Sequence, residues 1–230
     1  MVSLGMVKIV GPMTRRDLMP KAEFDDYYVN VHVQKAKLLP GLVKYVGSIC
    51  LRSANGEAPA FDAIAENYWA SLESISSIYS ERVWDEVRKD HPNMISGRTM
   101  FIAEEHEFLD DVRPGSSPIR YVALLTRKDA MPMDAFRKHW FEKHVPLALK
   151  TPGLLRYRAS VGLGSPNDAD SPAWDGMVEM WFESVAAFDS SFRDRYWDVL
   201  REDYYHNFAM GRLQFLTREH LVLDLSGPAG

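Results

Sequence analysis

The sequence predicts an α+β fold in which one βαββαβ unit occurs twice. Three observations lead to this prediction: an internal repeat, the same order of strand-like and helix-like segments in both copies, and a Pro/Gly/Ser-rich segment between them. Residues 13–45 align with residues 125–157 without a gap, and 13 of the 33 positions are identical. Similarity at a fixed offset is typical of two copies of one supersecondary unit.

The first strand and first helix come in the same order in both copies. Each copy begins with a short apolar run, "VKIVGPMT" or "RYVALLT", which predicts a strand. A helix is expected from about Pro20 and Pro132, because proline is favoured in the first turn of a helix. It should end before the Pro-Gly pairs at residues 40–41 and 152–153, where proline cannot continue it and glycine suits a turn.

The rest of each copy predicts two strands, a second helix and a last strand. The strand segments are "LVKYVGSICLRS" and "FDAIAENYWA" in the first copy, and "LLRYRASVGL" and "WDGMVEMWF" in the second. The loops "ANGEAP" and "GSPNDADSP" connect them with turn-forming residues. The second helix is expected to begin near Ser71 or Ser184, since serine suits an N-cap, and to carry Trp84 or Trp197.

The order βαββαβ predicts two tandem ferredoxin-like units, each with helices on one face of its sheet. The other face must be covered, and two copies in one chain can pack sheet to sheet and enclose a cavity. The alternative is two independent domains joined by a linker. We expect a first unit at residues 1–110, a linker at 111–118 and a second unit at 119–225. Large rings on the strands favour the packed pair: Tyr45, Tyr68 and Phe101, with Tyr157, Trp181 and Phe215 as their counterparts.

Composition excludes several classes of function. The net charge is −5 without a basic cluster, so nucleic acid is not an expected partner. No apolar run approaches the roughly 18 residues of a membrane span, and the N-terminus does not resemble a signal peptide. The single cysteine, Cys50, excludes an internal disulfide and suits a reducing cytoplasm. We therefore expect a cytoplasmic protein without a membrane partner.

A histidine lies on the apolar stripe of the first helix in both copies. Phe136, Trp140 and His144 are spaced four apart, and the first copy has Phe24, Tyr28 and His32 at the matching positions. Residues with this spacing share one helix face, so the imidazole should face the sheet. A buried neutral imidazole suits a general acid or base near neutral pH. The alternative is a core histidine with a purely structural hydrogen bond, and its retention in both copies does not separate the two interpretations.

Two further pairs of residues are weaker candidates. Tyr45 and Tyr157 follow the Pro-Gly pair by four residues and can donate to an oxyanion, although packing at the rim explains them as well. Asp62 and Asp175 open the third strand of each copy. They are candidates to orient a histidine, and a turn or cap is the competing role.

Charged pairs in both copies allow other interpretations. Arg15 and Arg127 end the first strand and can bind a substrate carboxylate, or form a surface ion pair with Asp17 or Asp129. A metal site with His32 or His144 is a further interpretation, suggested by the pairs Glu105-His106 and Glu219-His220. Adjacent strand residues point to opposite faces, so neither pair can share one ion, and we expect no metal. The sequence has no glycine-rich phosphate loop and no nucleophile motif, and no feature of it indicates haem binding. We therefore expect no cofactor.

The motif Phe-x3-(Trp/Tyr)-x3-His, then seven residues, then Pro-Gly-Leu-x2-Tyr resembles the EthD-like family of the dimeric α+β barrel superfamily. The resemblance covers nearly the whole chain twice, with Tyr28 in place of tryptophan in the first copy. It implies an α+β barrel of two ferredoxin-like units with a small apolar cavity. The family includes cofactor-free decarboxylases and dehydratases of polyketide aromatics, and lactone isomerases. Cys50 has Gly162 as its counterpart, so cysteine-assisted isomerisation is not expected.

These observations predict a cofactor-independent lyase or isomerase acting on a small aromatic or cyclic, oxygenated compound. His144 would move a proton, since the second copy fits the family pattern better, and Tyr157 or an arginine would stabilise the developing enolate or phenolate. His32, with Tyr45 as the matching tyrosine, would do likewise in a second pocket or assist. The expected substrate-binding residues are Trp140, Tyr28, Arg127, Arg15, Tyr68, Trp181, Phe101 and Phe215. The alternatives are a non-catalytic carrier or accessory protein with the same cavity, and a structural pairing module. A homodimer through exposed edges or helices is compatible with the sequence.

Overall fold

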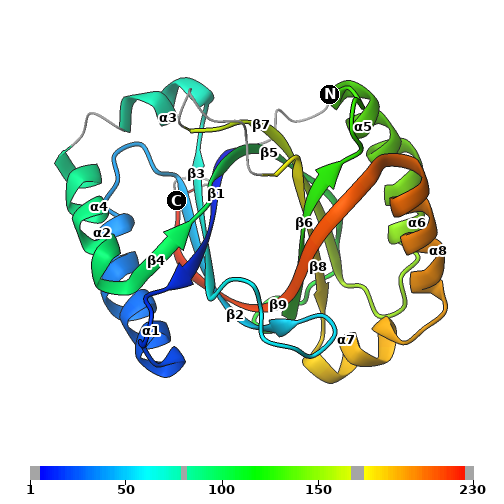
Figure 1. The fold of residues 1–230 in the computed structure, drawn as a ribbon, viewed down its shortest axis with the longest axis horizontal. Helices are drawn as coiled ribbons and strands as arrows, with labels where there is room; N and C mark the ends of the chain where they lie inside the picture. The colour runs from blue at the N-terminus through cyan, green and yellow to red at the C-terminus, as the bar shows by residue number, and fades with distance from the viewer. Residues whose placement is uncertain (1–5, 79–81, 167–173, 226–230) are drawn as a thin grey trace.

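The computed structural model describes residues 6–78, 82–166 and 174–225. Its centre is a closed barrel of eight antiparallel strands, and the helices pack on the outside in two groups (Figure 1). The strand order around the barrel is β3-β2-β9-β6-β8-β7-β5-β1, and β1 pairs with β3 to close the ring. A short strand, β4, pairs with the end of β1.

The first unit supplies four barrel strands and one group of helices. Its elements are β1 (Val7–Arg15), α1 (Lys21–Tyr27), η1 (Tyr28–His32), α2 (Val33–Ala36), β2 (Lys44–Ser53), β3 (Ala63–Trp69), α3 (Leu72–Ile78), α4 (Arg82–Met94), β4 (Ile95–Arg98) and β5 (Phe101–Asp110).

The second unit repeats this order. Its elements are β6 (Ile119–Arg127), α5 (Met133–His139), η2 (Trp140–His144), α6 (Val145–Ala148), β7 (Arg156–Gly164), β8 (Gly176–Phe182), α7 (Val185–Phe192), α8 (Tyr196–Asp203), η3 (Tyr204–Phe208) and β9 (Ala209–Asp224).

The two units form one barrel because their edge strands pair with each other. The strands β2 and β9 pair along one junction, and β5 and β7 pair along the other. Within each unit the order is β2-β3-β1-β5 or β7-β8-β6-β9. The predicted α+β architecture with two tandem units is therefore confirmed as a closed eight-stranded antiparallel barrel.

The first predicted helix of each unit is interrupted, and so is the second helix of the second unit. The first helix contains a π-helical turn, η1 or η2, which widens the backbone but keeps the aromatic residues and the histidine on the buried face. The second helix of the second unit is divided into α7 and α8. In the second unit the Asp194 carboxylate accepts a hydrogen bond from the Tyr196 N–H at 2.7 Å, which provides a new helix start after α7.

The predicted serine N-caps are present. Ser184 Oγ accepts from the Ala187 N–H at 3.1 Å, and Ser71 Oγ accepts from the Ser74 N–H at 3.3 Å. Part of the predicted loop "GSPNDADSP" and the tail "SGPAG" lie outside the described residues.

Alternation along the strands divides the core into three parts. Outward-facing residues such as Ile9 and Tyr121 pack under the helices of their own unit. Inward-facing apolar residues such as Val10, Phe101 and Phe215 fill one part of the barrel interior. The remaining inward positions carry charges.

Candidate functional site

The two histidines lie in the outer layers, between the first helix of their unit and the sheet. His32 and His144 each end the π-helical turn, and both are buried. The prediction that the imidazole faces the sheet therefore agrees with the structure. The cavities beside them lie under the helices, not between the two half-sheets as the sequence led us to expect.

An aspartate from the second helix region holds each histidine. His32 Nδ1 lies 2.9 Å from Asp90 Oδ2, and His144 Nδ1 lies 2.8 Å from Asp203 Oδ2. These aspartates are counterparts in the repeat, at the ends of "VWDEVRKD" and "YWDVLRED". The sequence offered Asp62 and Asp175 as candidates for this role beside a turn or cap, but Asp90 and Asp203 are the residues that hold the histidines.

Asp62 and Asp175 instead fix the first strand of their unit. Asp62 accepts from the Arg15 N–H at 2.8 Å and pairs with the Arg15 guanidinium. Asp175 accepts from the Arg127 N–H at 2.9 Å and pairs with its guanidinium. Both arginines are thus held by these aspartates rather than by Asp17 or Asp129. Neither arginine contributes to the lining of the histidine cavities.

Burial and the aspartate determine the state of His32. Burial lowers the pKa of His32 below its ordinary value, and the hydrogen bond and charge of Asp90 only partly oppose this. Burial alone would raise the pKa of Asp90, but hydrogen bonds from Lys35, His32 and Tyr27 hold it well below its usual range. A neutral His32 therefore donates from Nδ1 to an ionised Asp90, and Nε2 carries the lone pair of a base.

Each histidine lines a small cavity together with a tyrosine from the neighbouring strand. The first-unit cavity measures about 40 Å³ and includes His32, Tyr45, Asn67, Trp69 and His91. The second measures about 30 Å³ and includes His144, Tyr157, Met180, Tyr204 and Arg212.

Both tyrosines are fully buried, and burial raises their pKa well above the ordinary value. Both therefore keep their proton at neutral pH. Tyr157 Oη accepts a hydrogen bond from Trp140 Nε1 at 3.1 Å, which leaves its own proton for donation.

Other predicted binding residues are divided between the two faces of the sheet. Tyr28 and Trp140 pack on the histidine side, where the Tyr28 hydroxyl donates to the Ile64 carbonyl at 3.1 Å. Phe101 and Phe215 face the barrel interior, and Tyr68 and Trp181 contact the charged groups there. Side chains on a strand alternate between faces, so this set cannot line a single pocket.

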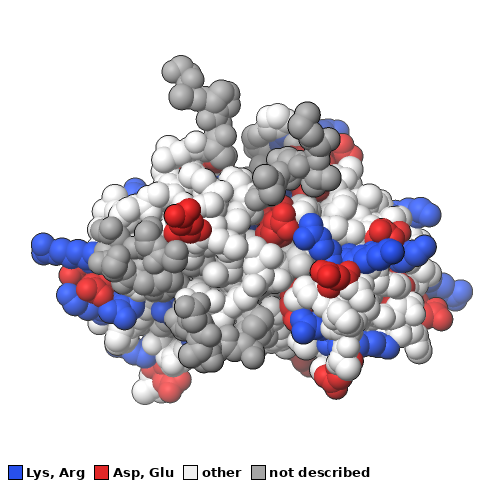
Figure 2. Space-filling model, turned by 90° about the horizontal axis from the view of Figure 1, so that it is seen from above, with Lys and Arg blue, Asp and Glu red and all other residues white. Residues whose placement is uncertain are grey.

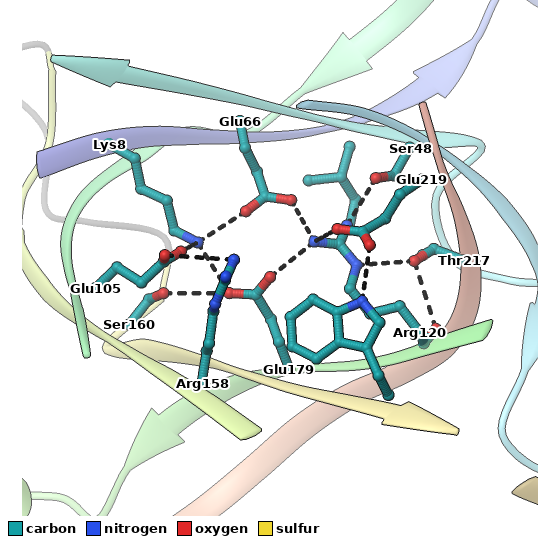
Figure 3. Close-up of polar contacts among 12 residues, drawn as sticks. Lys8, Ser48, Glu66, Glu105, Arg120, Arg158, Ser160, Glu179, Thr217 and Glu219 are labelled. Carbon is teal, nitrogen blue, oxygen red and sulfur yellow. Dashed lines mark hydrogen bonds and ion pairs between the residues drawn. The ribbon is translucent and has the colours of Figure 1, made fainter. Parts of the chain in front are cut away.

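A charged network fills the other part of the barrel interior (Figure 3). The residues of this barrel cluster are Lys8, Ser48, Glu66, Glu105, Arg120, Arg158, Ser160, Glu179, Thr217 and Glu219. At its centre two cations and two carboxylates alternate in a ring. Lys8 Nζ lies 2.7 Å from Glu66 and 2.8 Å from Glu179, and Arg120 Nη1 lies 2.5 and 2.7 Å from the same two carboxylates.

The ring joins the two units electrostatically. Burial alone would lower the pKa of Lys8, but the charges of Glu105, Glu179 and Glu66 raise it far above its ordinary value. Arg120 and Lys8 overcome the effect of burial on Glu66 and lower the pKa of that carboxyl. Burial and the charge of Glu66 instead raise the pKa of Glu179. Each cation bonds a glutamate of the other unit, so separating the units would leave buried charges without their partners.

The cluster also explains the Glu-His pairs. Glu105 bonds Lys8 inside the barrel at 2.6 Å, whereas His106 lies outside, 3.1 Å from Glu104 and against Phe141. Oxygens of Glu66, Glu105 and Glu179 lie within 4.8 Å of one another, a spacing that suits a metal ion. The Lys8 ammonium is bonded to all three carboxylates and supplies the positive charge there.

Sequence reasoning missed the barrel cluster although a signal was present. Lys8 and Arg120 occupy the same repeat position in otherwise apolar strands, as do Glu66 and Glu179. A charge kept in both copies of a buried strand indicates a paired interior charge. The pairing itself crosses between the units, so the repeat alone does not reveal it.

On one face of the molecule, charged side chains of both signs are mixed. Figure 2 shows basic and acidic side chains lying next to each other on one face rather than in patches of one sign. Among the described residues, no helix combines the length and apolar character needed to cross a membrane.

Solved structures similar to this chain share its fold across nearly its whole length. An anthrone oxidase-like protein is 10% identical, with a TM-score of 0.70, and covers 100% of this chain and 98% of its own. A proposed monooxygenase from Fusobacterium nucleatum is 8% identical, with a TM-score of 0.59 and coverages of 98% and 96%. A chlorite dismutase variant from Candidatus Nitrospira defluvii is 12% identical, with a TM-score of 0.56 and coverages of 94% and 92%. At these identities the likeness concerns the fold alone.

The sequence comparison is more specific. No curated protein matches the chain. The family model of the EthD domain matches it twice, over residues 16–98 and 128–211, and each match includes one histidine with its aspartate. The chain therefore belongs to the EthD family and carries two EthD domains joined in one α+β barrel.

Proposed function

We propose that this protein is a cofactor-independent lyase or isomerase for a small aromatic or cyclic, oxygenated compound. The observation that supports the proposal is the shared lining of each cavity by an aspartate-bonded histidine and a buried, protonated tyrosine. The names of the structural neighbours refer to enzymes, which is compatible with catalysis but does not specify the reaction.

The proposed chemistry uses the histidine as base and the tyrosine as donor. His32 Nε2, or its counterpart on His144, would take a proton from a carbon or hydroxyl next to a carbonyl group. The hydroxyl of Tyr45 or Tyr157 would donate to the oxygen of the resulting enolate or phenolate. Return of the proton to another atom completes an isomerisation. In a dehydration the enolate expels a hydroxide from the neighbouring carbon, and this hydroxide takes the proton back as water. In a decarboxylation the histidine takes the carboxyl proton, the bond to the carboxylate breaks with release of carbon dioxide, and the resulting enolate carbon takes the proton.

The second candidate function is a non-catalytic carrier that uses the same cavities. Buried polar atoms without partners in the first cavity favour this candidate, because a ligand can satisfy them without reacting. Binding without turnover separates the two functions.

The test is mass-spectrometric turnover of aromatic acids, phenols and lactones. Wild type would be compared with His144→Ala, His32→Ala and the double variant, and His206→Ala serves as control because His206 is exposed. The proposal predicts loss of carbon dioxide or water, or an isomeric product, with wild type and the control, and none with the double variant. Equal turnover by the double variant, or binding without any turnover, would exclude histidine catalysis.

Other expectations remain part of this proposal. They are the description of each unit as ferredoxin-like and packed sheet to sheet, the unit boundaries, the cytoplasmic location and the homodimer. Size-exclusion chromatography with light scattering tests the last of these.

A further inference from the structure

The two histidine cavities differ in how well their polar atoms are satisfied. In the first unit, Asn67 Oδ1 and Trp69 Nε1 are buried and have no hydrogen-bond partner among the described residues, and the Tyr45 hydroxyl, which lies beside that of Tyr28, has no acceptor for its own proton there. All three side chains line the cavity of about 40 Å³. Native proteins hold few such groups, because leaving a buried polar atom unpaired is unfavourable. Three around one cavity indicate a missing polar ligand.

These three side chains lie on one patch of the sheet. Tyr45 on β2 is directly opposite Asn67 on β3, and Trp69 follows two residues later on the same face. Directly opposed residues of antiparallel strands place their side chains next to each other. Tyr45 and Trp69 are each only 1% exposed, so bulk water does not satisfy them.

The matching positions of the second unit hold no such set of unpaired polar atoms among the described residues. Met180 stands in place of Asn67 and Phe182 in place of Trp69, and Tyr157 accepts from Trp140. Larger rings also enter this cavity. Tyr121 replaces Ile9 and bonds Gln214 at 2.9 Å, and Tyr204 replaces His91 and bonds the Gly211 carbonyl. Arg212 Nε has no partner there among the described residues, but the Arg212 guanidinium stacks on Tyr204.

We infer that the ligand site belongs to the first unit and takes a small, flat, uncharged compound with a carbonyl and a hydroxyl group on neighbouring atoms. Trp69 N–H and Tyr45 O–H donate to the carbonyl oxygen, Asn67 Oδ1 accepts from the hydroxyl, and His32 Nε2 takes the labile proton. The second cavity is packing that preserves the fold. This inference deepens the proposed function and rests on it for the role of His32 as base.

The walls of the cavity suit a flat ring, which enters only as the side chains around it move apart. One water needs about 10–15 Å³ by the same measure, so the space of about 40 Å³ holds about three waters, whereas an apolar cavity that binds benzene measures about 150 Å³. Ile9, Met13, Val87 and Trp84 supply apolar contacts.

The test is titration with tropolone, a flat ring that carries a carbonyl and a hydroxyl on neighbouring carbons, at a pH below the pKa of tropolone so that the probe is uncharged. Cycloheptatriene is the same ring without the oxygens. The six tryptophans give six indole N–H signals in a ¹⁵N-labelled protein, and Trp69→Phe identifies the signal of Trp69. We expect tropolone, and not cycloheptatriene, to shift the Trp69 signal downfield in a saturable way.

The repeat supplies matched variants. Asn67→Met and Trp69→Phe place in the first unit the residues that the second unit already accommodates, and each should weaken tropolone binding about tenfold through one lost hydrogen bond. Met180→Ala, in the second cavity, should leave the affinity unchanged. Thermal unfolding of each variant checks that the fold is retained.

Three outcomes would overturn the inference. They are no shift of the Trp69 signal, equal binding of both rings, and loss of binding in the Met180→Ala variant rather than in the first-unit variants. The inference and the proposed function fail separately. Specific binding at Trp69 without turnover of any compound in the panel would reject the proposed catalysis and support the ligand site in the first unit. Turnover that depends on His144 would support catalysis and reject the assignment of the site to the first unit.

Discussion

In both units the first helix packs on the sheet at matching positions, but the side chains at the contact differ. In the second unit the Trp140 ring presses on Gly176, where an added Cβ would lie 2.6 Å from the ring. The first unit has Tyr28 and Ala63 at these positions, and its glycine is Gly47, whose Cβ would lie 3.3 Å from the Tyr28 hydroxyl. A larger ring is thus matched by a smaller strand residue. The helix position and the strand position therefore change together, because the space between helix and sheet is the same in both units.

A second contrast separates the helix layers from the barrel interior. Each histidine pocket is built within one unit, so the two pockets can diverge independently. The barrel cluster is built from both units, and every central carboxylate is bonded to a cation of each unit. Divergence there is limited, since a change in one unit leaves a buried charge unpaired in the other.

Lys8→Met should have the largest effect because it breaks the cluster shared by the units. Three buried carboxylates lose their common cation, and we expect a loss of about 3–5 kcal/mol in the free energy of unfolding. Urea unfolding followed by tryptophan fluorescence measures it. Adding Glu105→Gln to this variant should recover part of the loss. A double variant no more stable than Lys8→Met would show that the charges are not coupled.

Gly176→Ala should destabilise the second unit by about 1–3 kcal/mol, because the new methyl group meets Trp140 and the Ser160 carbonyl. Its counterpart Ala63→Gly should cost only about 1 kcal/mol, through backbone freedom. The double variant Gly176→Ala/Trp140→Tyr reproduces the pairing of the first unit. Thermal unfolding should show it more stable than Gly176→Ala alone, and the matched-space explanation fails if it is not.

His91→Tyr should flatten the pH dependence of stability. Burial, with the charges of Arg98 and His32, lowers the pKa of His91 from 6.5 to about 3, against the opposing charge of Asp90. The unfolded chain therefore binds this proton first, and stability is lost as the pH falls from 6.5. Removing His91 should reduce the slope between pH 6.5 and 5, above the range in which carboxylates titrate. His32 keeps a smaller slope of the same sign. Unfolding midpoints across this range, unchanged by the substitution, would contradict the assignment.

The helix caps should give the smallest effect. Ser184→Ala removes the hydrogen bond to the Ala187 N–H and should cost about 1 kcal/mol. Ser71→Ala should cost less, because its hydrogen bond to the Ser74 N–H is longer, at 3.3 Å. Urea unfolding of both variants checks the order, and a larger loss for Ser71→Ala would reverse it.

Local sequence patterns predicted the helices and strands well, but they did not predict which distant side chains pair with each other. The Pro-Gly pairs, the serine caps and the four-residue spacing of His32 and His144 depend on neighbours in the chain, which the sequence displays directly. The partner of His32 is 58 residues away, and Lys8 meets Glu179 across 171 residues. Such pairs depend on how the sheet closes. The difference between the two cavities could not be predicted from the sequence either, because the lack of hydrogen-bond partners at Asn67 and Trp69 depends on which residues surround them in the fold.

Closure of the barrel has a consequence for the order of folding. The strand β2 finds its second neighbour only in β9, the last strand of the described chain, and β5 finds its own in β7. A nascent first unit therefore emerges with two open sheet edges and with Lys8, Glu66 and Glu105 short of their final partners. Contacts between such distant segments slow folding, so the half-made chain is the form most exposed to misassociation. Once β9 is in place, the barrel has no free edge along which another strand can add.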